Sequence, residues 1–178
     1  AAIKNPKFVK EAVKKFGSST IVISIEAIKQ KNGEYNAFTH NGRENSKLNV
    51  LKWIKKIEDL GAGEIFITSV DRDGTGQGFD IFLANKVSKI STIPIIFHGG
   101  AGKMKDILKL INESKVNGVS LSSILHYDFL SKSTYRKTHS IKTGNVDYLS
   151  SKRLPSNIKE NSIINIKKFL KKNKVICS

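Results

Sequence analysis

Apolar and polar positions alternate along the chain with two different periods. Helical spacing of apolar residues predicts helices over residues 5–17, 47–63, 80–90, 103–115 and 162–175. Short β-branched or aromatic runs between these helices predict strands over residues 20–28, 64–70, 93–100 and 118–125. Strands that read as continuous apolar runs and are joined through helices indicate an α/β fold whose parallel sheet is covered on both faces.

Four such units leave two architectures open, a doubly wound sheet and half of an eight-stranded barrel. Residues 31–43 contain two Asn-Gly pairs among alternating residues, which predicts a small hairpin. Residues 128–158 break the rhythm, because they are rich in Ser, Lys, Thr, Tyr and Asn with little apolar periodicity. We expect an insertion or a mobile loop at 128–158, within a single domain over 1–178.

The composition narrows the class of protein. The net charge is +16, which suits an anionic partner, but the lysines are spread along the chain and favour a generally basic surface. No aromatic stacking motif or recognition helix is visible, so we expect no nucleic-acid binding. The single cysteine, Cys177, excludes an intramolecular disulfide and a cysteine zinc cluster and fits a reducing cytoplasm. No apolar run approaches the roughly 20 residues that span a bilayer, so we expect no membrane association and a cytoplasmic protein.

Polar residues gather directly after the predicted strands. Glu26 follows the first, "DRDGTGQGFD" (71–80) the second and "HGGAGK" (98–103) the third, while "SSILHY" (122–127) ends the fourth. In parallel α/β folds, ligands bind at the carboxyl ends of the strands. The sequence therefore predicts a ligand site at this edge of the sheet.

The stretch 71–80 packs three aspartates and three glycines into ten residues. A calcium loop requires a late Glu, which is absent, and Phe79 interrupts the dinucleotide-binding spacing. What remains is a pair of carboxylates at a strand end followed by a flexible loop, which suits acid–base work under a mobile cover. We expect Asp71 to shape the loop and Asp73 to perform the chemistry.

Each of the other polar groups after a predicted strand has both a functional and a purely structural interpretation. Gly99, Gly100 and Gly102 either admit an anion close to the backbone or make a plain tight turn. Ser122 and Ser123 either add hydrogen-bond donors to that anion or only pack at the strand end. The charge of Glu26 in a buried strand would be costly without a role, so it is either an acid–base carboxylate or paired with a lysine.

Three histidines are candidates for acid–base roles, namely His40, His98 and His126. They lack the spacing of metal ligands, so we expect no metal site.

Three stretches carry a resemblance to a known family. "GAGEIFITSVDRDGTGQGFD", "IPIIFHGGAGK" and "GEYNAFTHNGR" resemble the HisF family, the cyclase subunits of imidazole glycerol phosphate synthase. The resemblance runs from Ala1 to about Tyr127 and resumes in the last helix, and it is to the C-terminal half of those subunits. It implies the C-terminal half of a (βα)8 TIM barrel, four parallel strands with helices, and a chain that is processed or part of something longer.

The resemblance also implies an activity. HisF enzymes take ammonia from a glutaminase subunit and cleave and cyclise a phosphoribulosyl imidazole-carboxamide substrate that carries two phosphates. The products are imidazole glycerol phosphate, for histidine biosynthesis, and an aminoimidazole-carboxamide nucleotide. No cofactor is implied.

Residue roles follow from the same resemblance. It implies a catalytic role for Glu26 and substrate or phosphate binding by a further set: Thr68, Asp73, Gly74, Gly99, Gly100, Ser122 and Ser123. It matches Glu64, at the opposite strand end, with a charged residue of the ammonia gate.

Two departures from the family pattern keep alternatives open. Glu26 stands where the family has a catalytic aspartate, one methylene shorter, and His98 stands where histidine-pathway enzymes usually have a small residue. HisF-like paralogues that act with glutaminase-like partners in the amidation of surface sugars are therefore an alternative. A non-catalytic scaffold that docks a glutaminase is another.

Overall fold

The structure is a computed structural model that describes residues 1–132 and 157–177. Its helices are α1 (Pro6–Phe16), α2 (Val50–Asp59), α3 (Ile81–Ile90), α4 (Met104–Glu113), α5 (Ser123–Lys132) and α7 (Ile163–Lys172), with a short 3-10 turn at Ser18–Thr20. Its strands are β1 (Val22–Lys29), β2 (Tyr35–Thr39), β3 (Glu44–Asn49), β4 (Glu64–Ser69), β5 (Ile95–His98) and β6 (Gly118–Val119). No described helix has the length and apolar character needed to cross a membrane.

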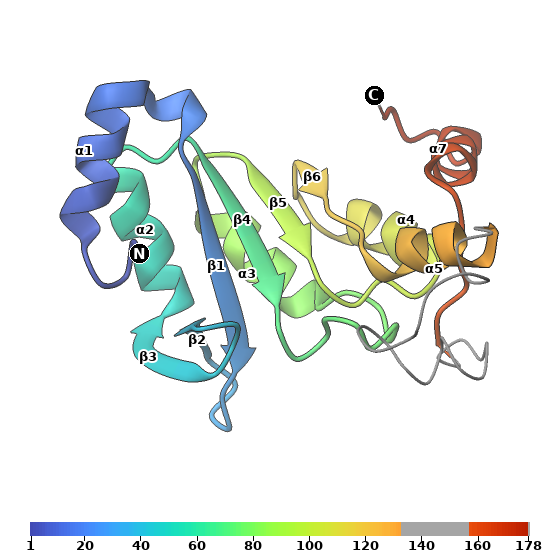
Figure 1. Cartoon of the computed structure of the whole chain (residues 1–178), viewed down its shortest axis with the longest axis horizontal. Helices are drawn as coiled ribbons and strands as arrows, with labels where there is room; N and C mark the ends of the chain where they lie inside the picture. Colours follow the sequence, from blue (N-terminus) through green and yellow to red (C-terminus); the bar gives the residue numbers. More distant parts are fainter. Residues whose placement is uncertain (133–156, 178) are drawn as a thin grey trace, which may run out of the picture.

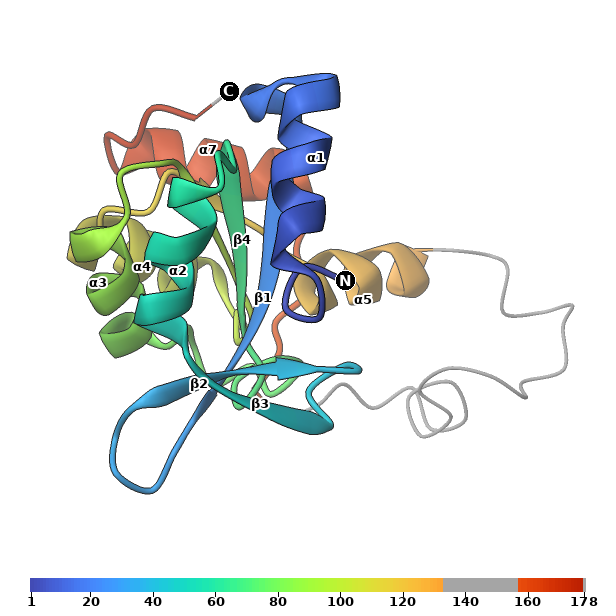
Figure 2. The same ribbon diagram turned by 90° about the vertical axis from the view of Figure 1, so that its left-hand side faces the viewer.

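The strand order decides between the two predicted architectures. The sheet runs β3-β2-β1-β4-β5-β6, and β1, β4, β5 and β6 are parallel (Figure 1). Each parallel strand lies beside its predecessor in the chain, whereas a doubly wound sheet reverses its order at a switch point. Figure 2 shows α2, α3 and α4 on one side of β1 and β4. The predicted half-barrel, four parallel strands with their helices, is confirmed.

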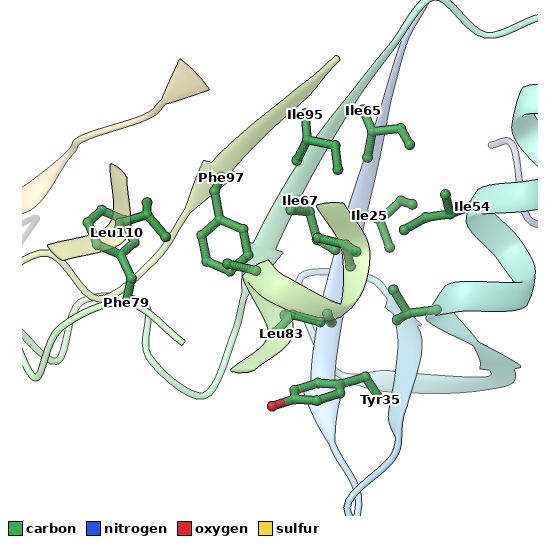
Figure 3. Packing of buried hydrophobic residues seen from close by; sticks show 14 of the residues in the cluster. Ile25, Tyr35, Ile54, Ile65, Ile67, Phe79, Leu83, Ile95, Phe97 and Leu110 are labelled. Atoms are coloured by element: carbon green, nitrogen blue, oxygen red, sulfur yellow. The ribbon is translucent and has the colours of Figure 1, made fainter. Parts of the chain in front are cut away.

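The core lies between the parallel strands and these helices. Alternate residues of each strand are buried there, while the residues between them face the opposite, open side of the sheet. Figure 3 shows the buried set meeting side chains of α2, α3 and α4; its labelled members include Ile25, Ile65, Ile67, Ile95, Phe97, Ile54, Leu83 and Leu110.

Both Asn-Gly pairs form turns, as predicted, but the strands extend further than expected. β2 pairs antiparallel with the end of β1, and β3 then pairs with β2. The turns place Gly33 and Gly42 at positive φ, a conformation that glycine adopts without strain. β3 takes residues that the apolar pattern assigned to a helix starting at 47. That helix begins at Val50 instead, because the Asn49 side chain accepts hydrogen bonds from the N–H groups of Leu51 and Lys52 and caps it.

The prediction of a strand over 118–125 was wrong after Val119. Helix α5 begins at Ser123, and the Ser122 carbonyl accepts the His126 N–H at 2.9 Å. A short apolar run fits a buried helix face as well as a strand, and here Ile124 is fully buried from a helix. Residues 128–132 also belong to α5, and Ile158 is buried in the core. The rest of the insertion or mobile loop expected at 128–158, namely residues 133–156, lies outside the described residues.

Tyr35 provides a test of how the hairpin is joined to the sheet. Its ring is buried beside Leu83 of α3 (Figure 3). Its hydroxyl donates to Asp80 Oδ2 at 2.7 Å. Burial, followed by the hydrogen bond to Asp80, raises the pKa of Tyr35. We expect Tyr35→Phe to lower the free energy of unfolding by about 2 kcal/mol, measured by urea denaturation at neutral pH, because a hydrogen bond to a charged acceptor is lost.

The same contact has a pH dependence. The unfolded chain releases the tyrosine proton from about pH 10, while the folded protein retains it. The stabilisation is therefore complete below that pH and declines above it, and the difference from Tyr35→Phe should shrink there. Equal urea midpoints of the two proteins at neutral pH would contradict the assignment.

An unpaired edge of β1 gives a second prediction. β4 pairs with one edge of β1 over residues 22–27, while β2 pairs with the other edge only from Glu26 onward. Within the described structure, no strand pairs with that second edge over residues 22–25, and Val22 is 48% exposed. Because free strand edges associate, we expect a protein made of residues 1–178 alone to dimerise or to be poorly soluble. Val22→Lys should shift sedimentation toward a monomer, and a stable monomer of the unchanged chain would contradict this expectation.

Candidate functional site

Three polar side chains form a row across the open face of the sheet. Glu26 of β1 is in register with Thr68 of β4, and Thr68 is in register with His98 of β5. Their preceding neighbours on the other face are buried in the core, namely Ile25, Ile67 and Phe97. Since adjacent strands lie about 4.8 Å apart, the row spans about 10 Å. The row lies near the carboxyl ends of the strands, where the sequence predicted a ligand site.

Glu26 is held by the β2–β3 turn. Its Oε2 accepts the backbone N–H of Gly42 at 2.8 Å, and it forms no ion pair with a lysine in the described ranges. Gly42 has φ +76°, and a Cβ there would come within 2.9 Å of the Val70 side chain. Among the described residues, the lysine-paired alternative for Glu26 therefore finds no support. A half-buried carboxylate oriented by one N–H group at a strand end can act on a bound substrate.

The role of Gly42 was missed by sequence reasoning. The Asn-Gly pair identified the turn, but no sequence signal shows that the N–H of Gly42 points at Glu26. That contact exists because β2 folds back onto β1 with Glu26 opposite Phe38.

The loop after β4 is organised by its own backbone and by Asp71. The Asp71 carboxylate accepts the N–H of Lys29 at 2.8 Å, which ties the loop to the end of β1. The N–H of Asp73 donates to the carbonyl of Ser69 at 3.0 Å. The predicted loop-shaping role of Asp71 is confirmed by this contact, and the carboxylate of Asp73 remains for other partners.

Asp73 meets His98 across the site. His98 Nε2 lies 3.3 Å from Asp73 Oδ1, and His98 Nδ1 lies 3.2 Å from the carbonyl oxygen of Ser120. The His98 ring also packs on Phe66, with centroids 5.6 Å apart. Of the three candidate histidines, this one lies in the polar row and contacts Asp73.

The two other histidines have different surroundings. His40 pairs with Glu44 at 3.1 Å in the turn beside Glu26, and the His126 ring packs edge-on against Tyr127 in α5. Within the described residues, no group of three His, Cys, Asp or Glu side chains is placed to hold a metal ion.

Glycines let the 98–103 segment approach the loop after β4. A Cβ at Gly99 would lie 2.6 Å from the Ser69 carbonyl oxygen, and one at Gly100 would lie 2.3 Å from the Gly78 carbonyl oxygen. The N–H of Gly78 donates to the Gly100 carbonyl at 2.8 Å. Glycine is therefore required here for packing between two loops, whether or not an anion binds.

The N-terminus of α4 already has an acceptor of its own. Asp106 accepts the N–H groups of Gly102 and Lys103, both at 3.0 Å. An anion at this edge would instead meet the backbone around Gly99 and Gly100 together with the N-terminus of α5 at Ser122 and Ser123. Helix N-termini attract anions, because their first N–H groups lack intrahelical partners.

A small concavity brings most of the predicted binding residues together. Its lining comes from three segments, the loop after β4, the loop after β5 and the residues before α5, and includes Asp73, Gly74, His98, Gly99, Gly100, Ser122 and Ser123. Thr68 lies beside it in the polar row. Glu64 does not join this group, because it stands four residues before Thr68 on the same face of β4, about 13 Å away.

Comparison with known proteins agrees with this geometry. The family described as "Histidine biosynthesis protein" matches residues 1–131. The chain is 45% identical over 128 residues to the imidazole glycerol phosphate synthase subunit HisF of Prochlorococcus marinus (strain MIT 9515), covering 71% of this chain and 50% of that protein.

More distant organisms carry similar proteins. Identity to the subunit HisF of Clostridium botulinum (strain Okra / Type B1) is 41% over 132 residues, 74% of this chain and 52% of that protein. Identity to the subunit HisF of Streptococcus mutans (strain ATCC 700610 / UA159) is 37% over 137 residues, 77% of this chain and 55% of that protein. The chain spans about half the length of the curated relatives it matches. Its match over residues 1–131, together with the parallel half-barrel, shows that the chain belongs to the HisF family of histidine biosynthesis proteins.

Proposed function

We propose that this chain forms the C-terminal half of an ammonia-dependent cyclase of the imidazole glycerol phosphate synthase type. The reaction would convert a phosphoribulosyl imidazole-carboxamide nucleotide into imidazole glycerol phosphate and an aminoimidazole-carboxamide nucleotide. The observation that carries the proposal is the row Glu26–Thr68–His98 beside a small, glycine-lined concavity at one edge of the sheet.

The two ends of the row suit different parts of such a substrate. One phosphate would lie against the backbone of Gly99 and Gly100 and the first N–H groups of α5, at Ser122 and Ser123. The reacting part would lie over the row, between Glu26 on one side and Asp73 on the other. Thr68, between them, offers a hydroxyl that can donate or accept a hydrogen bond.

Glu26 is the general acid–base group in this proposal. Its Oε2 is oriented by Gly42, so the carboxylate faces the open side of the sheet in a defined geometry. Proton transfer by a positioned carboxylate contributes about 10²- to 10⁴-fold to a rate. Asp73 and Gly74, on the loop after β4, would hold the substrate from the opposite side.

The opposite end of the sheet suits ammonia entry. Glu64 begins β4 and lies on the same face as Thr68. We propose that a glutaminase subunit docks at this end and that Glu64 forms part of the gate through which ammonia passes toward the row.

A second candidate function is the amidation of a surface-polysaccharide sugar with a glutaminase-like partner. It is favoured by Glu26 in the place of the family's aspartate and by the imidazole of His98 inside the site. Growth of a histidine auxotroph that lacks the cyclase, after introduction of the full-length protein, decides between the two. Failure to grow, with sugar amidation restored in a strain that lacks the paralogue, would favour the second.

Substitution of Glu26 tests catalysis. We expect Glu26→Gln in the full-length protein to lower kcat about 10²-fold or more with little change in KM, because the side chain keeps an oxygen for Gly42 but loses its proton-transfer capacity. The measurement is product formation with ammonium salts as the nitrogen source, which removes any dependence on the glutaminase.

Two further variants complete this test. Glu113→Gln, an exposed carboxylate at the end of α4, should leave kcat unchanged. Glu26→Asp should change kcat measurably, because a shift of about 1 Å matters for a positioned acid–base group. A kcat that is indifferent to both changes at Glu26 would favour the scaffold that only docks a glutaminase.

A further inference from the structure

Both ring nitrogens of His98 face oxygen atoms that accept hydrogen bonds. Nδ1 lies 3.2 Å from the Ser120 carbonyl oxygen, which has no proton to give, and Nε2 lies 3.3 Å from a carboxylate oxygen of Asp73. A neutral imidazole carries one N–H group and can satisfy one of these acceptors. Both contacts are hydrogen bonds only when the ring carries two protons or when Asp73 carries one. The His98 ring therefore lies within hydrogen-bonding distance of the Ser120 carbonyl on one side and of the Asp73 carboxylate on the other.

The ring is fixed more firmly than the carboxylate. His98 belongs to β5, its side chain is 16% exposed and its ring packs on Phe66 of β4. Asp73 is 48% exposed and lies on a loop whose three glycines, Gly74, Gly76 and Gly78, all have positive φ. The strand residue can therefore determine where the loop carboxylate points.

No other charged side chain among the described residues lines the concavity in which His98 meets Asp73. Apart from His98 and Asp73, the described lining consists of glycine, alanine, leucine and serine residues. β4 contributes the Phe66 ring, and the residues after β6 contribute a backbone carbonyl. Arg72 lines a different pocket with Asp71 and Asp80, and Glu26 is two strands away.

We propose that His98 is a positioning residue for Asp73. Anchored by Ser120 and Phe66, its imidazole directs the Asp73 carboxylate over the polar row and holds the loop after β4 in its substrate-binding position. His98 therefore affects the reaction rate by orienting Asp73, and it does not contribute to binding of the substrate phosphate. This role rests on the proposed function only in so far as activity is the readout.

A double-mutant cycle in the full-length protein tests this dependence. We expect His98→Phe, which keeps a ring against Phe66 but removes both nitrogens, to lower kcat/KM about 10-fold. Asp73→Ala should lower it about 10²-fold, and the double variant should match Asp73→Ala alone, because His98 then has no side-chain oxygen left to position. Glu113→Gln combined with His98→Phe is the matched control and should show additive effects.

Two measurements without substrate test the contact itself. Long-range ¹H–¹⁵N spectra of the imidazole should show the His98 Nε2 signal changed by Asp73→Asn, while the His98→Phe variant identifies which signals belong to this ring. Inorganic phosphate, titrated while the amides of Gly99, Gly100 and Ser123 are followed, should bind with the same affinity before and after His98→Phe. Neither measurement needs turnover. If the wild-type protein had no cyclase activity, the proposed function would be overturned, but the His98–Asp73 contact could still be tested in this way.

A conservative replacement separates positioning from packing. His98→Gln supplies an amide N–H for Asp73, so it should recover part of the kcat/KM that His98→Phe loses. Additive effects of His98→Phe and Asp73→Ala on kcat/KM would overturn the proposal. So would loss of phosphate affinity in His98→Phe, or a His98 Nε2 signal indifferent to Asp73→Asn.

Discussion

The alternation of side chains along β1, β4 and β5 is the constraint on which the rest of the structure depends. Every second residue enters the core against α2, α3 and α4, so the residues between them must face the open side of the sheet. The polar row of Glu26, Thr68 and His98 exists because the three strands are in register. A slip of one residue in any strand would turn its polar side chain into the core at a large desolvation cost.

Close contacts between loops convert this row into a site. The 98–103 segment touches the loop after β4 through Gly99 and Gly100, where a side chain would collide with backbone oxygens. Asp71 ties the same loop to the end of β1, and Gly42 brings the hairpin turn onto Glu26. Three loops that follow different strands thus hold one another, which limits how far any of them can move without the others.

At two of the candidate site residues, the chain departs from the pattern that the family resemblance implies. Glu26 is one methylene longer than the aspartate that the family resemblance implies, and the turn at Gly42 supplies an N–H that meets the longer side chain. His98 fills a place where a small residue would leave Asp73 without its partner. Both changes lie in the polar row, which in the proposed function meets the reacting part of the substrate.

The sequence by itself determined the parallel α/β class and both Asn-Gly turns, because these follow from apolar periodicity and local backbone preferences. It also pointed to the strand ends as the ligand edge. It misassigned residues 120–125, where a short apolar run fits a strand and a helix equally. Only the tertiary structure decided that Gly42 holds Glu26 and that His98 meets Asp73. These contacts join residues far apart in the chain, and strand register and loop packing, which no local pattern encodes, bring them together.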